Sequence, residues 1–164
     1  MKAKAAIEHQ VAMDIPCLML PMSEHQMLAP TVSIAEIVSY QTPVPVLDAP
    51  DWLVGLIEWR KQKLPLLSLE VLRGEARAEI TAKSRVAVFN NTGVSDDLPF
   101  FAVVTQGIPR LTRVLEASIS EVQDQRPLPF ERLRVHVEGE VCSIPDVAAM
   151  EQLLLDYRRN GGEI

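Results

Sequence analysis

Hydrophobic residues in this chain come in short runs separated by turn residues, which is the pattern of β-strands. The clearest run is 132–138, where Leu133, Val135 and Val137 alternate with charged and polar side chains. A turn separates it from a second apolar run at 141–144. Because successive side chains of a strand point to opposite faces, the two runs predict a hairpin with one buried and one solvated face.

Shorter apolar runs predict further strands at residues 15–22, 27–29, 85–90, 100–105 and 108–115. Turn-forming residues separate the first two and the next two, so these runs predict two more hairpins. Residues 31–38 mix β-branched side chains with a spacing of three to four, which indicates a helical turn running into a strand. Residues 71–82 and 117–129 are polar and are expected to be connections.

Residues 43–69 contain two apolar runs, 53–57 and 64–69, on either side of a polar turn. Several prolines precede the first run and favour an extended lead-in, because proline fixes φ and restricts the residue before it. Together these features predict another hairpin. Pro65 lacks a backbone donor, so we expect its end of the strand to lie at an edge or a bulge.

Gly55 interrupts the first of these two runs. A glycine weakens a strand and offers no side chain to pack, so its presence has two explanations. Either another backbone or a partner comes close at this point, or the strand contains a simple bulge. The sequence favours neither explanation over the other.

One strong helix signal lies near the end of the chain. Asp146 is a good N-cap residue. The apolar residues that follow it fall on one stripe of a helix: Val147, Met150, Leu153, Leu154 and Tyr157. Two glycines at 161–162 then end the pattern, which predicts a helix packed on the sheets.

The sequence therefore predicts an all-β fold with one C-terminal helix. At 164 residues the chain is long enough for one well-buried domain or for two small subdomains that share a core. We expect a single domain over residues 14–158, between flexible tails at 1–13 and 159–164.

Composition excludes several classes of function. The formal net charge is -6, whereas a nucleic-acid surface needs clustered Lys and Arg, so nucleic acid is not an expected partner. No apolar run is long enough to span a bilayer, and polar residues interrupt the N-terminal segment where a signal peptide needs an apolar core. We therefore expect a cytoplasmic protein without membrane insertion, in which Cys17 and Cys142 are buried and reduced.

Residues with catalytic or metal-binding chemistry are sparse. The histidines are His9, His25 and His136, and none has other ligand residues at metal-binding spacing. His25 lies next to Glu24 on a predicted turn and is expected to be solvated. The sequence also lacks a nucleophile elbow, a phosphate loop and a dinucleotide motif. It thus predicts no enzyme activity, cofactor or metal, and favours protein partners. A small-ligand-binding barrel, the alternative, would require polar groups that converge inside a cavity.

An acidic residue between apolar ones, Glu36, precedes a proline-containing linker and then Gly55 and Arg60. This arrangement resembles the signature of the CheW family of bacterial chemosensory coupling proteins. The resemblance continues through the later strands and the helix, and it covers roughly residues 14–158.

Three positions depart from the family pattern. Lys61 stands where the family usually has glycine, and Ser68 and Gln106 stand where it usually has aspartate. These departures indicate a divergent member. Within the family, the chain looks like the accessory proteins of chemosensory systems that control type IV pili, of which ChpC is an example.

The resemblance implies a fold of two small five-stranded β-barrels that share a core. It also implies a non-enzymatic adaptor in two-component signalling, which couples methyl-accepting chemoreceptors to a CheA-type histidine kinase in chemotaxis or in type IV pilus (twitching) motility. The alternative is an accessory CheW-like domain that competes with the main coupling protein, with other CheW-like proteins as its partners.

The resemblance points to Glu36 and Arg60 as partner-binding residues, because they occupy the family's signature positions. We expect the two side chains to pair across the first barrel and to be partly buried by their apolar neighbours. Trp59 lies at a polar turn, where it is expected either to anchor a contact or to cover the core.

Ile34, Leu53 and Gly55 are further partner-binding candidates, as parts of a groove that receives a receptor helix. Gly55 would allow the helix to approach the strand backbone. Ile34 and Leu53 suit ordinary core packing equally well.

Overall fold

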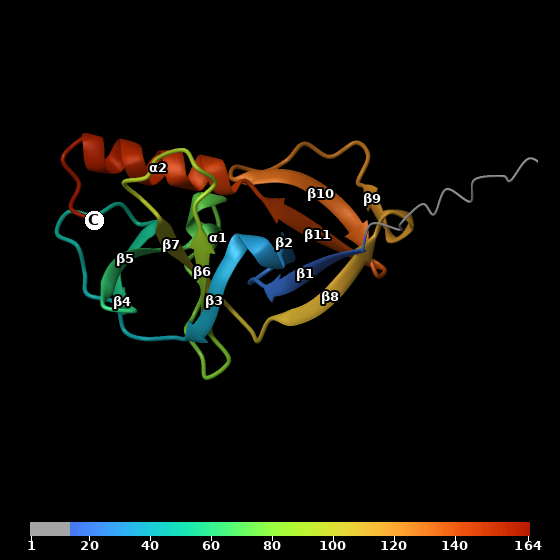
Figure 1. The fold of residues 1–164 in the computed structure, drawn as a ribbon, viewed down its shortest axis with the longest axis horizontal. Coiled ribbons are helices and arrows are strands. Elements are labelled where there is room, and N and C mark those ends of the chain that lie inside the picture. The colour runs from blue at the N-terminus through green and yellow to red at the C-terminus, as the bar shows by residue number, and fades with distance from the viewer. Residues whose placement is uncertain (1–13) are drawn as a thin grey trace, which may run out of the picture.

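The computed structural model describes residues 14–164 and confirms the all-β class, with strands in two curled sheets and one long helix near the C-terminus (Figure 1). The expected tail at residues 1–13 lies outside the described residues. The predicted hairpins are present in both sheets.

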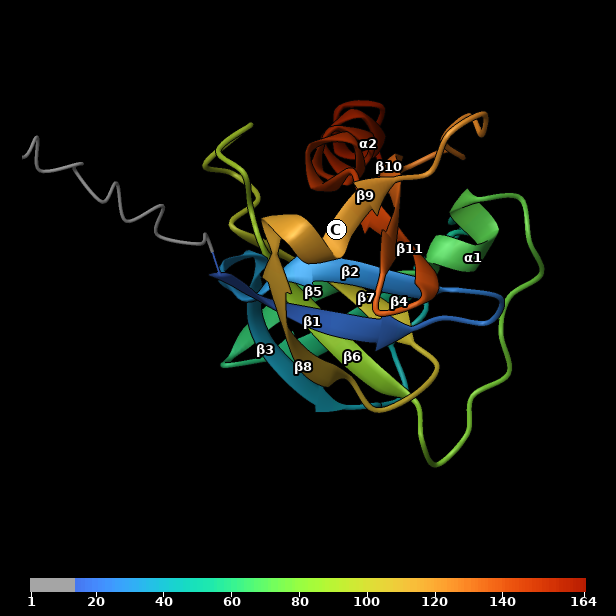
Figure 2. The ribbon, with the colours of Figure 1, turned by 90° about the vertical axis from the view of Figure 1, so that its right-hand side faces the viewer.

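The first sheet has six strands in the order β8-β1-β2-β11-β10-β9. Its strands are β1 (Asp14–Pro21), β2 (Gln26–Pro30), β8 (Arg110–Leu115), β9 (Ile119–Glu121), β10 (Glu131–Val137) and β11 (Glu140–Pro145). Figure 2 shows this sheet curling from β8 through β1 and β2 to β11 and β10. Its neighbours are antiparallel except β2 and β11. This sheet has one strand more than the five that the resemblance implied, because the short β9 forms inside the polar connection at 117–129.

The second sheet has five strands in the order β3-β6-β7-β5-β4. Its strands are β3 (Ile34–Ser39), β4 (Leu53–Trp59), β5 (Gln62–Leu67), β6 (Arg85–Asn90) and β7 (Phe100–Thr105). Only β5 and β7 run parallel. The predicted helical turn before β3 is the 3-10 turn η1 (Thr31–Ser33), and a second such turn, η2 (Glu116–Ser118), precedes β9.

Three apolar clusters make up the core of the protein. One lies inside the curl of the six-stranded sheet, and a second lies inside the curl of the five-stranded sheet. The third joins the sheets and includes Leu20 from β1, Phe89 from β6 and Met150 from the C-terminal helix. This third cluster is the shared core that the resemblance implied, because it takes residues from both subdomains.

The helix α2 (Val147–Arg159) covers the shared core and lies along the side of the five-stranded sheet toward β10 (Figure 1). The Asp146 carboxylate accepts a hydrogen bond from Ala149 N at 3.0 Å, which confirms the predicted N-cap. Met150 and Leu154 on the predicted stripe are fully buried. Burial of this stripe fixes α2 across both sheets.

The end of the chain is also held in place. Gly162 N donates to the Tyr157 carbonyl at 2.9 Å, and Arg158 Nη2 donates to the Ile164 carbonyl at 3.4 Å. Ile164 packs against the shared core. Residues 159–164, expected to be a flexible tail, therefore make specific contacts with α2.

Two local features follow from side-chain and backbone hydrogen bonding. A short helix, α1 (Leu69–Leu72), occupies the start of the expected 71–82 connection, because Ser68 caps it by accepting a hydrogen bond from Val71 N at 3.4 Å. Pro65 lies opposite Leu56, and pairing of β5 with β7 begins only after it, at Leu66. Pro65 thus lies at a locally unpaired edge, as predicted.

Candidate partner-binding site

The candidate site lies at the seam between β3 and β4, the two outer strands of the five-stranded sheet. In the described part of the chain, side chains rather than a backbone ladder join these strands. Trp59 Nε1 donates to Glu36 Oε2 at 2.7 Å. The Gln41 side chain donates from Nε2 to the Glu58 carbonyl at 3.0 Å and accepts from Glu58 N at 3.3 Å. The Gln41 amide thus takes the place of a backbone peptide group and closes the curl of the sheet.

Arg60 completes the seam from the turn after β4. Its Nη2 lies 3.4 Å from Glu36 Oε2, and its guanidinium lies 4.6 Å from the centroid of the Trp59 ring. The predicted pairing of Glu36 and Arg60 is confirmed. The expected partial burial is wrong, because the two side chains are 42% and 65% exposed. An ion pair this exposed contributes at most about 1 kcal/mol to stability, so its charges remain available to a partner.

Trp59 covers the core and is not an exposed anchor. The residue is only 5% exposed and packs edge-to-face on Phe100, with ring centroids 4.8 Å apart. Burial of an indole is favourable when its N–H finds an acceptor, and Glu36 supplies that acceptor. Of the two roles that the sequence left open for Trp59, the structure shows that it covers the core, and the acceptor that allows this burial lies on a distant strand.

The turn between β4 and β5 presents positive charge beside this seam. Arg60 and Lys61 have φ values of 47° and 62°, in the left-handed region that glycine adopts most readily. The side chains of Arg60, Lys61 and Lys63 are all exposed. In a chain of net charge -6, this turn is a local concentration of positive charge.

Gly55 is explained by the protein's own backbone. A Cβ at this position would lie 2.5 Å from the Val44 carbonyl oxygen, and φ is +150°. Val44 N and O exchange hydrogen bonds with Leu56 at 2.8 Å, so the proline-containing linker covers the strand here. The register also shifts between Leu53 and Gly55, which is a bulge. Both sequence explanations therefore hold, and the linker occupies the space that a partner helix was expected to fill.

Leu53 and Ile34 differ in how much of their surface is available. Leu53 is 3% exposed and belongs to the shared core. Ile34 is half-buried and packs against the edge of that core. Of the six candidates, Glu36 and Arg60 are exposed, Ile34 is half-buried, and the other three are buried.

The groups gathered at the seam are an ion pair, an indole and an amide. Within residues 14–164, His, Cys, Asp and Glu side chains nowhere gather in threes that would suit a metal ion. Over the same residues, the helices are too short or too polar to cross a membrane.

Cys17 and Cys142 are buried free thiols, and burial raises the pKa of Cys142 to about 11.

A buried carboxylate that the sequence did not reveal connects the two sheets. Glu70 in α1 is only 1% exposed. Its Oε1 accepts from Ser23 N at 3.2 Å and from Gln106 Nε2 at 3.3 Å, so it ties the β1–β2 turn to the segment after β7. An acidic residue inside the apolar stretch 64–72 is the signal that points to such a buried role.

His25 is half-buried, so the expectation that it is solvated is wrong. Arg73 Nη1 lies 2.7 Å from His25 Nδ1 and also contacts Nε2. Burial, together with the positive charges of Arg73 and Arg134, lowers the pKa of His25 to about 4. The imidazole is therefore neutral at neutral pH and accepts a hydrogen bond from Arg73.

Comparison with known proteins gives one family and one fold. Residues 16–153 match the CheW-like domain family. Among solved structures, the crystal structure of the scaffolding protein TtCheW from Thermoanaerobacter tengcongensis is similar, with a TM-score of 0.70 and 14% identity over 84% of this chain and 87% of that chain. At this identity the likeness concerns the fold alone. No curated protein matches the chain by sequence.

Proposed function

Because the chain belongs to the CheW-like domain family, we propose that it is a non-enzymatic cytoplasmic adaptor that couples chemoreceptors to a CheA-type histidine kinase. The family match over residues 16–153 is the observation that carries this proposal. It gives the chain a scaffold role in chemosensory signal transduction. Control of type IV pili is the pathway that we propose within that role.

The seam between β3 and β4 supports the proposal because it offers exposed charges that are already fixed in place. Glu36 accepts a hydrogen bond from the buried Trp59 indole, and Arg60 lies over the same indole. Side chains that are ordered before binding lose less conformational entropy when a partner binds. We assign Glu36 and Arg60 to direct partner contact on this basis.

The remaining candidates have supporting roles in this proposal. Trp59, Leu53 and Gly55 are buried, so they shape the contact surface without touching the partner. Ile34 is half-buried and supplies an apolar contact beside the charges.

One observation favours a competing accessory domain as the second candidate. Lys61 places a long charged side chain at φ +62°, next to Arg60, where the family usually has glycine. A changed charge at the signature turn alters which partners are attracted there. A competing domain binds the kinase and excludes the main coupling protein from it.

Calorimetric titration of the full chain with the CheA-type kinase of the same organism tests the proposal. We expect saturable binding that Arg60→Glu weakens by about tenfold or more, because the substitution places like charges together at the contact. Arg126→Glu is the matched control, since Arg126 is exposed outside the seam. Absence of binding by the wild-type chain, or equal losses in the two variants, would overturn the assignment.

A further inference from the structure

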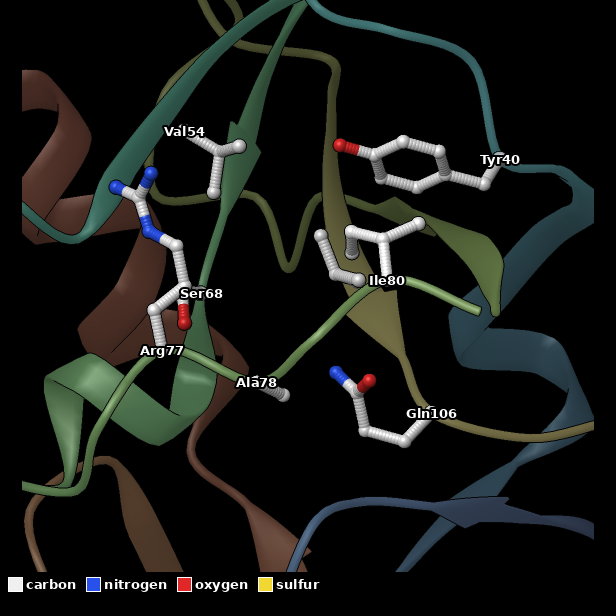
Figure 3. Close-up of a pocket in the computed structure, with 8 residues that line it drawn as sticks. Tyr40, Val54, Ser68, Arg77, Ala78, Ile80 and Gln106 are labelled. Atoms are coloured by element: carbon white, nitrogen blue, oxygen red, sulfur yellow. The ribbon is translucent and has the colours of Figure 1, made fainter. Parts of the chain in front are cut away.

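A cavity of about 160 Å³ lies at one open end of the curled five-stranded sheet (Figure 3). Tyr40, Ser68 and Gln106 follow the ends of β3, β5 and β7, and Val54 lies at the start of β4. Because β3, β5 and β7 run in one direction and β4 runs against them, all four positions meet at the same end of the sheet. Trp59 lies at the opposite end of β4, but Tyr40 directly precedes Gln41, whose side chain bonds to Glu58. The cavity therefore adjoins the partner-binding seam without sharing its residues.

The segment after α1 crosses this open end of the sheet and forms the outer wall of the cavity. Arg77, Ala78 and Ile80 come from this segment, which has no regular secondary structure. Arg77 Nη2 donates to the Asp51 carbonyl, which fastens the segment to the start of β4. Arg77 and Ile80 are exposed, so this wall of the cavity borders solvent.

Three neutral polar groups lining the cavity have hydrogen-bonding capacity left over. Ser68 Oγ accepts from Val71 N, which leaves its hydroxyl proton free to donate. Gln106 uses Nε2 to donate to Glu70, which leaves its carbonyl oxygen. Over residues 14–164, the Tyr40 hydroxyl makes no hydrogen bond to another protein group. These are the convergent polar groups that a ligand-binding barrel requires.

The charge of the cavity selects the kind of ligand. Among the eight lining residues, Arg77 carries the only formal charge. Figure 3 shows its guanidinium and the Tyr40 hydroxyl pointing toward Val54 from opposite sides. A planar guanidinium presents paired donors that match a carboxylate, and a phenol adds a third donor. An anionic head group is therefore favoured at this place.

The volume of the cavity and its apolar lining residues indicate what kind of chain the anionic group carries. Val54, Ile80 and Val104 give the cavity its apolar surface. An apolar protein cavity of about 150 Å³ accommodates a molecule the size of benzene, so about six non-hydrogen atoms fit here. A four-carbon chain that ends in a carboxylate has this number of atoms.

We propose that this cavity binds a short-chain aliphatic monocarboxylate, with the carboxylate between Arg77 and Tyr40 and the alkyl chain against Val54, Ile80 and Val104. The cavity adjoins the seam at Tyr40 and Gln41 but shares none of the seam residues, so butyrate is expected to bind in the absence of the kinase and the receptor. The inference therefore stands or falls independently of the adaptor role.

Titration of the full chain with sodium butyrate, followed by two-dimensional amide NMR against sodium chloride at equal ionic strength, tests the proposal. We expect saturable shifts at the amides of the lining residues, with a dissociation constant on the order of millimolar for so small a ligand. 1-Butanol has the same alkyl chain without the charge and is expected to bind at least about tenfold more weakly.

Two variants locate the site, and a third serves as the control. Arg77→Gln removes the charge and is expected to weaken butyrate binding by about tenfold. Ala78→Leu fills the cavity without a charge change and is expected to abolish the saturable shifts while the rest of the spectrum stays dispersed. Arg126→Gln removes one exposed charge outside the cavity and should bind as the wild type does. Non-saturable shifts, equal binding of 1-butanol, or unchanged binding by Arg77→Gln would overturn the proposal.

Discussion

Trp59 and Glu36 lie 23 positions apart in the sequence, yet the indole N–H of one donates to the carboxylate of the other at 2.7 Å. This bond crosses the gap between the two outer strands of the five-stranded sheet. It buries an aromatic side chain while leaving a carboxylate at the surface. A single hydrogen bond therefore both satisfies the buried indole and holds the exposed Glu36 carboxylate in place.

Trp59→Phe tests how much this contact contributes to stability. The substitution keeps a ring against Phe100 but removes the donor to Glu36, so we expect a loss of about 2 kcal/mol in the free energy of unfolding, as for a hydrogen bond to a charged group. Urea denaturation measures it. Trp52→Phe is the control, because Trp52 makes an edge contact with Tyr157 and, within the described residues, its indole N–H has no acceptor. Equal losses in both variants would show that the hydrogen bond adds nothing.

Gly55→Ala tests the close approach of the linker to β4. A methyl group would lie 2.5 Å from the Val44 carbonyl oxygen, so we expect a loss of about 3 kcal/mol from the clash and the strained φ together. Gly74→Ala is the matched control: its φ is +84°, but nothing lies within 4 Å of the added Cβ. That variant should lose only about 1 kcal/mol. A Gly55→Ala protein as stable as Gly74→Ala would contradict the packing described here.

The contact between Glu70 and Gln106 predicts a charge-dependent effect at the junction of the sheets. Gln106→Glu would place a second carboxylate against the buried Glu70, and we expect a loss of about 2 kcal/mol in the free energy of unfolding. Combining it with Glu70→Gln exchanges the amide and the carboxylate, so most of the stability should return. If the double variant is no more stable than Gln106→Glu alone, the two side chains do not interact.

His25 predicts a pH dependence of stability between the two pKa values that the group has when unfolded and folded. The folded pKa is about 4, below the ordinary value of 6.5. The unfolded chain therefore binds a proton in this window while the folded protein does not, so stability falls as pH decreases from 6.5 to 4. With allowance for partial exposure of the ring, the loss is on the order of 1–2 kcal/mol.

Denaturation of the wild-type protein and of His25→Asn across this pH range measures the effect. The variant retains the neighbouring acids Glu24, Glu75 and Glu131, so these side chains are common to both proteins. Only the part of the slope that belongs to the imidazole should therefore disappear. An identical slope in both proteins would mean that His25 is as free to accept a proton in the folded state as in the unfolded one.

Local pattern predicted most of the strands and the main helix. Alternation in β10, the cap at Asp146 and the glycine in β4 each reflect a demand made by neighbouring residues, and such demands are visible in a short stretch of sequence. The short β9 and α1 were missed because each is too brief to show a period. The parallel pairings of β2 with β11 and of β5 with β7 join distant segments, which no local pattern records.

The candidate site was only partly predictable for the same reason. The resemblance identified Glu36 and Arg60, and the structure brings them together. The burial of Trp59 depends on an acceptor from β3, and the role of Gln41 depends on the position of Glu58. Neither contact leaves a signal in its own stretch of sequence, so the sequence alone does not distinguish an exposed Trp59 from one that covers the core.

Sedimentation of the kinase with receptor-bearing vesicles shows whether this chain is an adaptor. Vesicles that carry the chemoreceptor are mixed with the CheA-type kinase, with and without the full chain, in the absence of any other coupling protein. If the chain is an adaptor, the kinase sediments with the vesicles only when the chain is present, and Arg60→Glu reduces the sedimented fraction while Arg126→Glu does not. Kinase recovery that is the same with and without the chain would contradict it.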